Sequence, residues 1–141
     1  ESTLKNGISK PVASFVIPLC ATIHLSGSMI KLTLYAFAIV YMANLDISTG
    51  TGLGFIFLLG IMMIAAPGVP GGAVMVAAGL LADMMGFDDG MVALMIAAYI
   101  AIDSVGTAAN VTGDGAIAMI VDKFAGDKKG PTEEEPAEAT A

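Results

Sequence analysis

The sequence predicts an all-α integral membrane protein, in which two transmembrane helices, the first of them broken, flank a re-entrant helical hairpin. Of its 141 residues, 56% are hydrophobic and only 13% are charged, which is about half the charged fraction of a soluble domain. The charges lie mainly at the two ends of the chain and in short connecting stretches. Two long apolar runs, with two short ones between them, set the number of elements.

The composition also excludes several classes of protein. The chain has six lysines, no arginine and a net charge of −7, so no nucleic-acid partner is expected. Cys20 is the single cysteine, which excludes a disulfide framework and a multi-cysteine metal site. The chain begins with Glu1, and no targeting segment with a charged and then an apolar part opens it. We therefore expect a fragment of a longer membrane protein.

Residues 1–11 are polar and predict a cytoplasmic lead-in, and residues 12–43 form the first apolar run. This run exceeds the roughly 20 helical residues that cross a bilayer core of about 30 Å. A polar island interrupts the run, so the span is expected to be broken. The island consists of Thr22, His24, Ser26, Gly27 and Ser28, and Lys31 follows it.

The middle region, 53–82, contains two apolar pieces that are too short to span. These pieces, 53–66 and 73–82, hold 14 and 10 residues, which as helices reach only ~21 Å and ~15 Å. Between them, PGVPGG at 67–72 breaks any helix, because proline lacks an N–H donor and glycine frees the backbone. The region is either one bent span or a re-entrant hairpin with its tip at 67–72.

A second span is predicted over residues 91–121, with loops at 44–52 and 83–90 on either side of the hairpin. Residues 122–141 are polar and predict a disordered acidic cytoplasmic tail. Five of the six lysines flank the two spans, whereas both loops carry aspartates and no lysine. Because loop lysines favour the cytoplasmic side, both ends are predicted inside. A hairpin keeps the two ends on one side, whereas a single middle crossing separates them.

Four polar residues form a stripe in the last span, because helical residues three and four apart share a face. Its members are Asp103, Thr107, Asn110 and Asp114. An acid at the centre of a membrane costs about 3 kcal/mol on insertion scales, so Asp103 is expected to be functional. The alternative is a protonated acid or a helix-packing hydrogen bond. Gly106 leaves room beside the stripe, and Gly113 is expected to loosen the helix next to Asp114.

The polar residues of the first run each have two interpretations. His24 is either a packed, hydrogen-bonded histidine, which is the commoner case, or a ligand. Lys31 is either a side chain that extends to an interface or a functional charge. Cys20 is most simply a small buried hydrophobe.

The order of these motifs resembles the dicarboxylate/amino acid:cation symporters, the family of the glutamate transporters. FVIPLCATIHLSGS is similar to that family's seventh transmembrane segment, AAPGVPGG to the tip of its second hairpin, and DSVGTAANVTGD to its eighth segment. The resemblance covers about residues 5–124. It implies part of an elevator-type transport domain in a multi-pass protein of the plasma or inner membrane, which works as a homotrimer with a scaffold domain and a first hairpin.

The resemblance also implies a site for an amino acid or a small dicarboxylate, and sites for Na⁺ as the coupling ion, with H⁺ as the alternative. Asp103 matches the acid that holds the substrate amino group. The implied substrate-binding residues are Asp103, Thr107, Asn110, Val69 and Gly71. The implied cation-binding residues are Cys20, His24, Asn110, Asp114, Thr22, Ile64 and Ala66.

Two departures from the family pattern bear on ion and substrate. The family's N-M-D-G-T motif reads H-L-S-G-S at 24–28, so a cation-binding Asp has become Ser26. Hard cations prefer charged oxygens, so that sodium site is weakened. The Arg that pairs with an acidic substrate has become Gly106, which removes a bidentate partner for a second carboxylate. We therefore expect a secondary active transporter of a neutral rather than an acidic amino acid.

The alternatives are a dicarboxylate:cation symporter, a channel-like protein and a non-transporting relative. An enzyme is not expected, because no nucleophile motif or metal cluster accompanies the polar residues. Two hypotheses concern coupling. Lys31 would be a fixed charge that stands in for a coupling cation in the segment where the Asp was lost. His24 would carry a proton, since imidazole changes its charge between about pH 5 and 8.

Overall fold

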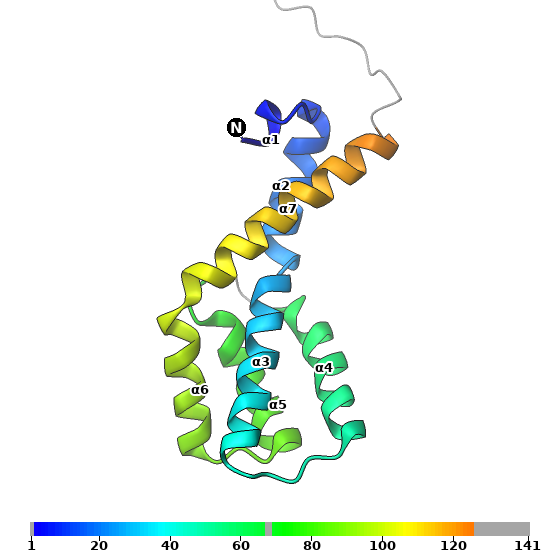
Figure 1. The fold of residues 1–141 in the computed structure, drawn as a ribbon. Helices are drawn as coiled ribbons and strands as arrows, with labels where there is room; N and C mark the ends of the chain where they lie inside the picture. The colour runs from blue at the N-terminus through cyan, green and yellow to red at the C-terminus, as the bar shows by residue number, and fades with distance from the viewer. Residues whose placement is uncertain (1, 67–68, 126–141) are drawn as a thin grey trace, which may run out of the picture.

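The computed structural model describes residues 2–66 and 69–125, and within these ranges every regular element is a helix (Figure 1). In chain order the helices are α1 (Ser2–Lys5), α2 (Lys10–Ile23), α3 (Ser26–Met42), α4 (Thr49–Met63), α5 (Gly72–Met85), α6 (Asp89–Ala101) and α7 (Asp103–Ala125). The all-helical part of the predicted fold class is confirmed.

Helices α2 and α3 form one long arm that is interrupted at His24 and Leu25. Together they cover Lys10–Met42, which is long and apolar enough to cross a membrane. Pro11 lies in the first turn of α2, where its missing N–H is not needed. The chain leaves α2 at His24, whose backbone is extended with φ −100° and ψ 95°. The break therefore falls inside the polar island.

Helices α4 and α5 pack against each other, and each is shorter than a span (Figure 1). α4 begins four residues before the predicted apolar piece, because the Ser48 side chain accepts a hydrogen bond from the Thr51 N–H at 3.0 Å and caps the helix. α5 continues to Met85 and ends at Gly86, whose left-handed backbone with φ 69° stops it. Residues 67 and 68 of the predicted tip lie outside the described residues.

The last apolar run, which was expected to form an unbroken transmembrane helix over 91–121, is divided into two helices. α6 and α7 meet at Ile102 with a bend of 62°. α7 then continues without interruption, so Gly113 does not loosen it, and the helix reaches Ala125, three residues beyond Asp122. Residues 126–141 of the predicted tail lie outside the described residues. By length and composition, the described residues contain one helix that can cross a membrane. A second possible span results if α6 and α7 together are counted as one span.

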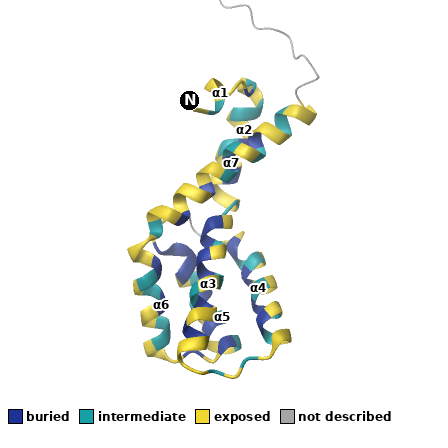
Figure 2. Ribbon diagram, viewed as in Figure 1, coloured by how far each residue is buried: buried dark blue, intermediate teal, exposed yellow. Residues whose placement is uncertain are grey.

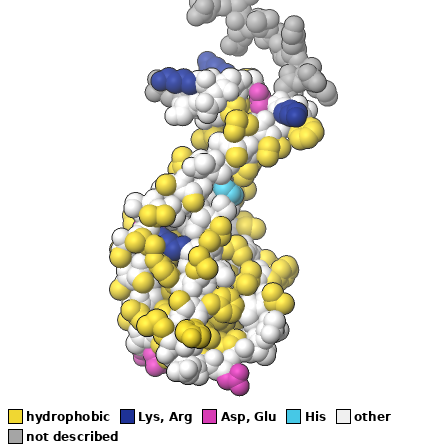
Figure 3. Space-filling view, in the orientation of Figure 1, with side chains coloured by type: hydrophobic (Ala, Val, Ile, Leu, Met, Phe, Trp, Pro, Cys, Tyr) yellow, Lys and Arg dark blue, Asp and Glu magenta, His cyan; other side chains and the backbone are white. Residues whose placement is uncertain are grey.

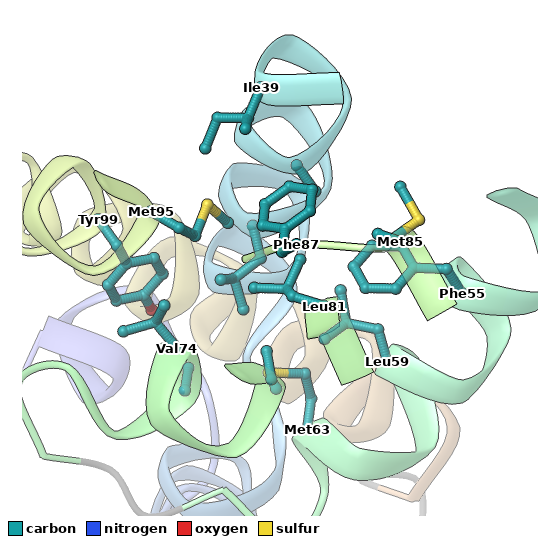
Figure 4. Close-up of a cluster of buried hydrophobic side chains, with 14 of the residues drawn as sticks. Ile39, Phe55, Leu59, Met63, Val74, Leu81, Met85, Phe87, Met95 and Tyr99 are labelled. Carbon is teal, nitrogen blue, oxygen red and sulfur yellow. The ribbon is translucent and has the colours of Figure 1, made fainter. Parts of the chain in front are cut away.

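The main buried core lies where α3, α4, α5 and α6 meet (Figures 2 and 4). Leu32, Phe55, Leu59 and Leu81 are fully buried there. A smaller cluster around Val16, Cys20 and Ala118 joins α2 to α7. The outer faces of the helices carry many exposed large hydrophobic side chains (Figure 3), which is typical of surfaces that lipid or other protein covers.

Both ends of the described chain lie at one end of the molecule, and the loops after α3 and α5 lie at the other (Figure 1). Acidic side chains lie at the loop end and basic side chains near the chain ends, where an acidic side chain also lies, and a further basic side chain lies between the two ends (Figure 3). The re-entrant hairpin between two crossings stays a prediction.

Candidate functional site

A cavity of about 280 Å³ lies where the break between α2 and α3, the start of α5, the end of α6 and the first half of α7 meet. Its polar lining residues are His24, Ser28, Asp103, Thr107, Asn110 and Asp114. Its other lining residues are Ala21, Leu25, Val69, Pro70, Ala73, Tyr99 and Val111. A few convergent polar groups on otherwise apolar walls are the usual composition of a small-molecule site.

The structure brings most of the expected substrate-binding residues to this cavity. Those that line it are Val69, Asp103, Thr107 and Asn110. Gly71 does not line it, because this residue is the N-cap of α5 and its φ of 76° shapes the turn into the helix. A Cβ at this position would lie 3.6 Å from the Ile100 side chain, so Gly71 packs against α6 instead.

The expected cation-binding residues divide into two groups. His24, Asn110 and Asp114 line the cavity, whereas Cys20, Thr22, Ile64 and Ala66 do not. Cys20 is buried between α2 and α7, and its carbonyl accepts the His24 N–H at 2.7 Å. Thr22 is exposed and donates its hydroxyl to the Leu19 carbonyl of its own helix at 2.7 Å. No group of three or more His, Cys, Asp or Glu side chains able to hold a metal occurs in the described parts of the chain.

Lys31 and Asp103 form an ion pair across the bend between α6 and α7, with Nζ and Oδ1 3.0 Å apart. The Lys31 side chain is only 7% exposed and that of Asp103 is 24% exposed. The ammonium also lies 3.5 Å from the centre of the Tyr99 ring, within the range of a cation–π contact. The partner of Lys31 is therefore Asp103, and the hypothesis that Lys31 stands in for a coupling cation stays a prediction.

His24 and Asp114 form a second pair at the cavity, with Nδ1 and Oδ1 2.7 Å apart. Gly113 makes this contact possible, because a Cβ there would collide with the His24 ring. The role of Gly113 is thus to admit the histidine, not to open the helix. The carboxylate that was expected to bind sodium already has an imidazole as its neighbour.

Asn110 is buried and connects α7 to the start of α3. Its Oδ1 accepts hydrogen bonds from the backbone N–H groups of Gly27, at 2.8 Å, and Ser28, at 3.4 Å. Its Nδ2 donates to Ser28 Oγ at 3.1 Å. The first N–H groups of a helix have no partner within the helix, so Asn110 caps α3 from a distant part of the chain.

Two features of the site were missed by the sequence analysis, namely the pairing of the charges and the part played by Tyr99. The apolar segments contain two basic side chains, His24 and Lys31, and two acids, Asp103 and Asp114. Charged groups in a membrane pair with one another, so the equal numbers were a signal for two pairs. The position of Tyr99, four residues before Asp103, was the corresponding signal for an aromatic wall.

Comparisons with known proteins agree with this picture. The sequence model described as "Sodium:dicarboxylate symporter family" matches residues 1–124. Over 109 residues the chain is 27% identical to the protein named "Neutral amino acid transporter A" from Bos taurus and 28% identical to the one from Homo sapiens. These matches cover 77% of this chain and 20% of each relative, so the chain spans about a fifth of the length of the curated relatives it matches. No solved structure matches.

Proposed function

Because this chain belongs to the sodium:dicarboxylate symporter family, we propose that it supplies the substrate-binding part of a cation-coupled amino acid transporter in the plasma or inner membrane. The family consists of membrane transporters and not of enzymes. The observation that carries the proposal is the cavity, in which polar groups of α7 face the helix break and the start of α5. By the resemblance, the complete protein adds a scaffold and a first hairpin and works as a homotrimer.

The proposed substrate is a neutral amino acid. Its ammonium group binds Asp103, whose Oδ2 makes no hydrogen bond with a described residue while Oδ1 holds Lys31. An acidic substrate needs a second positive partner, and Gly106 supplies none. His24, the basic side chain that lines the cavity, is already paired with Asp114. The names of the two mammalian relatives agree with a neutral substrate, and a dicarboxylate is the alternative.

The proposal is tested by uptake into proteoliposomes that contain the complete protein. We expect saturable uptake of labelled alanine or serine that stops when the sodium gradient is dissipated. Non-saturable flux would instead indicate a channel. Absence of both uptake and substrate-protected thermal stability would indicate a non-transporting relative, and preference for succinate would favour the dicarboxylate alternative.

Two threonines of α7 provide a matched pair of variants for the same assay. Thr107 and Thr112 both donate their hydroxyl to the carbonyl four residues earlier, at 3.0 Å and 2.8 Å. Only the first of them lines the cavity. Thr107→Val is expected to reduce uptake about tenfold, the effect of losing one hydrogen bond of about 1.4 kcal/mol, whereas Thr112→Val should leave uptake unchanged. Equal effects of both changes would contradict the proposed site.

For coupling, we propose that Na⁺ is the driving ion and that protonation of His24 contributes. The groups that face the imidazole are Asp114 and, across the cavity, Asp103. Wild-type uptake should therefore depend on the external pH between about 5 and 8, and His24→Asn should make uptake independent of pH. A wild type whose uptake rate is flat over this range would refute the role of His24.

A further inference from the structure

The Lys31 ammonium lies in a complete shell of oxygen acceptors at the bend between α6 and α7. Nζ is 3.0 Å from Asp103 Oδ1, 3.2 Å from the Tyr99 carbonyl oxygen and 3.5 Å from the Ile102 carbonyl oxygen. An ammonium group has three N–H donors, so each donor has an acceptor. None is left to bind a substrate in the cavity.

The shell arises from the helix break itself. α6 ends at Ala101, and the last carbonyl groups of a helix have no partner within the helix and carry a partial negative charge. The Tyr99 carbonyl is one such group, whereas the Ile102 carbonyl, at the junction of the two helices, also accepts the Val105 N–H at 3.1 Å, and Asp103 is the first residue of α7. Two carbonyls and a carboxylate at a broken helix form the kind of oxygen set that binds monovalent cations in transporters.

The space for the ammonium depends on Gly106. A Cβ at this position would lie 3.1 Å from Lys31 Nζ and 3.3 Å from Cε, which is closer than side chains normally approach. A second cavity of about 260 Å³ runs along the Lys31 side chain and is lined also by Gly27, Ile30, Leu34 and Ile102. This cavity gives small molecules a route to the shell when the lysine is shortened.

From these contacts we infer that Lys31 is a tethered cation, which permanently occupies a monovalent-cation site formed by the Tyr99 and Ile102 carbonyls and the Asp103 carboxylate. Shortening the side chain exposes the site to a dissolved cation. The site itself does not depend on transport. Its consequence for coupling rests on the proposed function: wild-type protein needs no dissolved cation at the bend, because this charge moves with the protein.

The test is thermal unfolding of the complete protein in detergent, with methylammonium chloride or choline chloride added at equal concentrations. Lys31→Ala removes the ammonium and leaves the space that it occupied empty. We expect its unfolding midpoint to lie several degrees below that of the wild type, and to rise with methylammonium but not with choline, as mass action requires of a bound ligand. Sodium and potassium are added in parallel to find which inorganic ion fits.

Two further variants make the result specific. Lys31→Met removes the charge but fills the hole, so methylammonium should not raise its midpoint. Lys31→Ala combined with Asp103→Asn removes the anionic ligand, so rescue should disappear there as well. Equal responses of all three variants, or equal responses to methylammonium and choline, overturn the inference. If Lys31→Ala cannot be purified even with methylammonium present, while the double variant can, the inference is overturned too.

Wild-type uptake separates this inference from the proposed function. Methylammonium rescue in a protein that transports nothing would support the cation site and refute the transport function. Sodium-driven uptake by the wild type without rescue in Lys31→Ala would give the opposite result.

Discussion

Replacing Asp103 with Ala is expected to lower the free energy of unfolding by about 3–5 kcal/mol, the usual cost of leaving a buried charge without its partner. Lys31 is 7% exposed, and its ammonium lies among the Tyr99 and Ile102 carbonyls and the Asp103 carboxylate, so this change leaves a buried charge without its anionic partner. The loss is measured by chemical unfolding of the complete protein in detergent. Uptake should be lost at the same time, because Asp103 lines the cavity.

A double-mutant cycle isolates the charge pair from other effects of the substitution. Asp103→Ala combined with Lys31→Met removes both charges, and this variant should recover most of the lost stability. Asp83→Ala, in the exposed last turn of α5, is the control and should change the stability by less than about 0.5 kcal/mol. The Lys31–Asp103 pair does not stabilise the fold if Asp103→Ala lowers the free energy of unfolding no more than Asp83→Ala does.

Gly27→Ala is expected to have the second large effect, because it forces α3 away from α7. A Cβ on Gly27 would lie 2.5 Å from the Gly106 carbonyl oxygen and 2.6 Å from Ala109 Cβ. These atoms belong to the backbone and first side-chain carbon of α7, which cannot rotate away. Overpacking of this kind costs about 1–3 kcal/mol, and here it also strains the cap that Asn110 makes on α3.

Gly115→Ala provides the matched control for this substitution. A Cβ at Gly115 would meet nothing within 4 Å, and alanine favours an α-helix over glycine by about 1 kcal/mol. The two glycine variants should therefore shift the thermal unfolding midpoint in opposite directions. A stabilised Gly27→Ala would show that the two helices do not make this close contact.

The existence of the helices could be predicted from the sequence, because the length of each apolar run shows whether a helix of that length can cross the membrane. Their ends depended on local caps, such as Ser48 before α4 and Gly86 after α5, which shift the boundaries by several residues. The bend at Ile102 could not be predicted. The run Ile100-Ala101-Ile102 is apolar and contains no Gly or Pro, and the lysine that holds the bend lies 72 residues before Asp103.

The candidate site could also be predicted only in part. Helical spacing alone placed four polar residues on one face of α7, and the cavity includes all of them. Their partners come from helices that are far away in the chain, so spacing carried no information about the pairs with His24 and Lys31. The cation-binding residues were carried over from the family, and three of them, Thr22, Ile64 and Ala66, which the resemblance assigns to a sodium site separate from that of Asn110 and Asp114, do not line the cavity.

The distribution of hydrogen bonds divides the helices into two groups, one joined by side-chain hydrogen bonds and one held by apolar contacts alone. Side-chain hydrogen bonds tie α7 to α2 and α3 through Asp122, Asp114, Asn110 and Asp103. Among the described residues, no hydrogen bond joins α4 or α5 to another helix; apolar contacts hold this pair in place. Lipid tails are as apolar as leucine side chains, so an outward movement of α4 and α5 replaces apolar protein contacts with equivalent lipid contacts. A movement of α7 relative to α2 and α3 would instead leave charged side chains without their partners. Slow, concerted displacement is therefore expected of α2, α3 and α7, and fast, independent opening of α4 and α5.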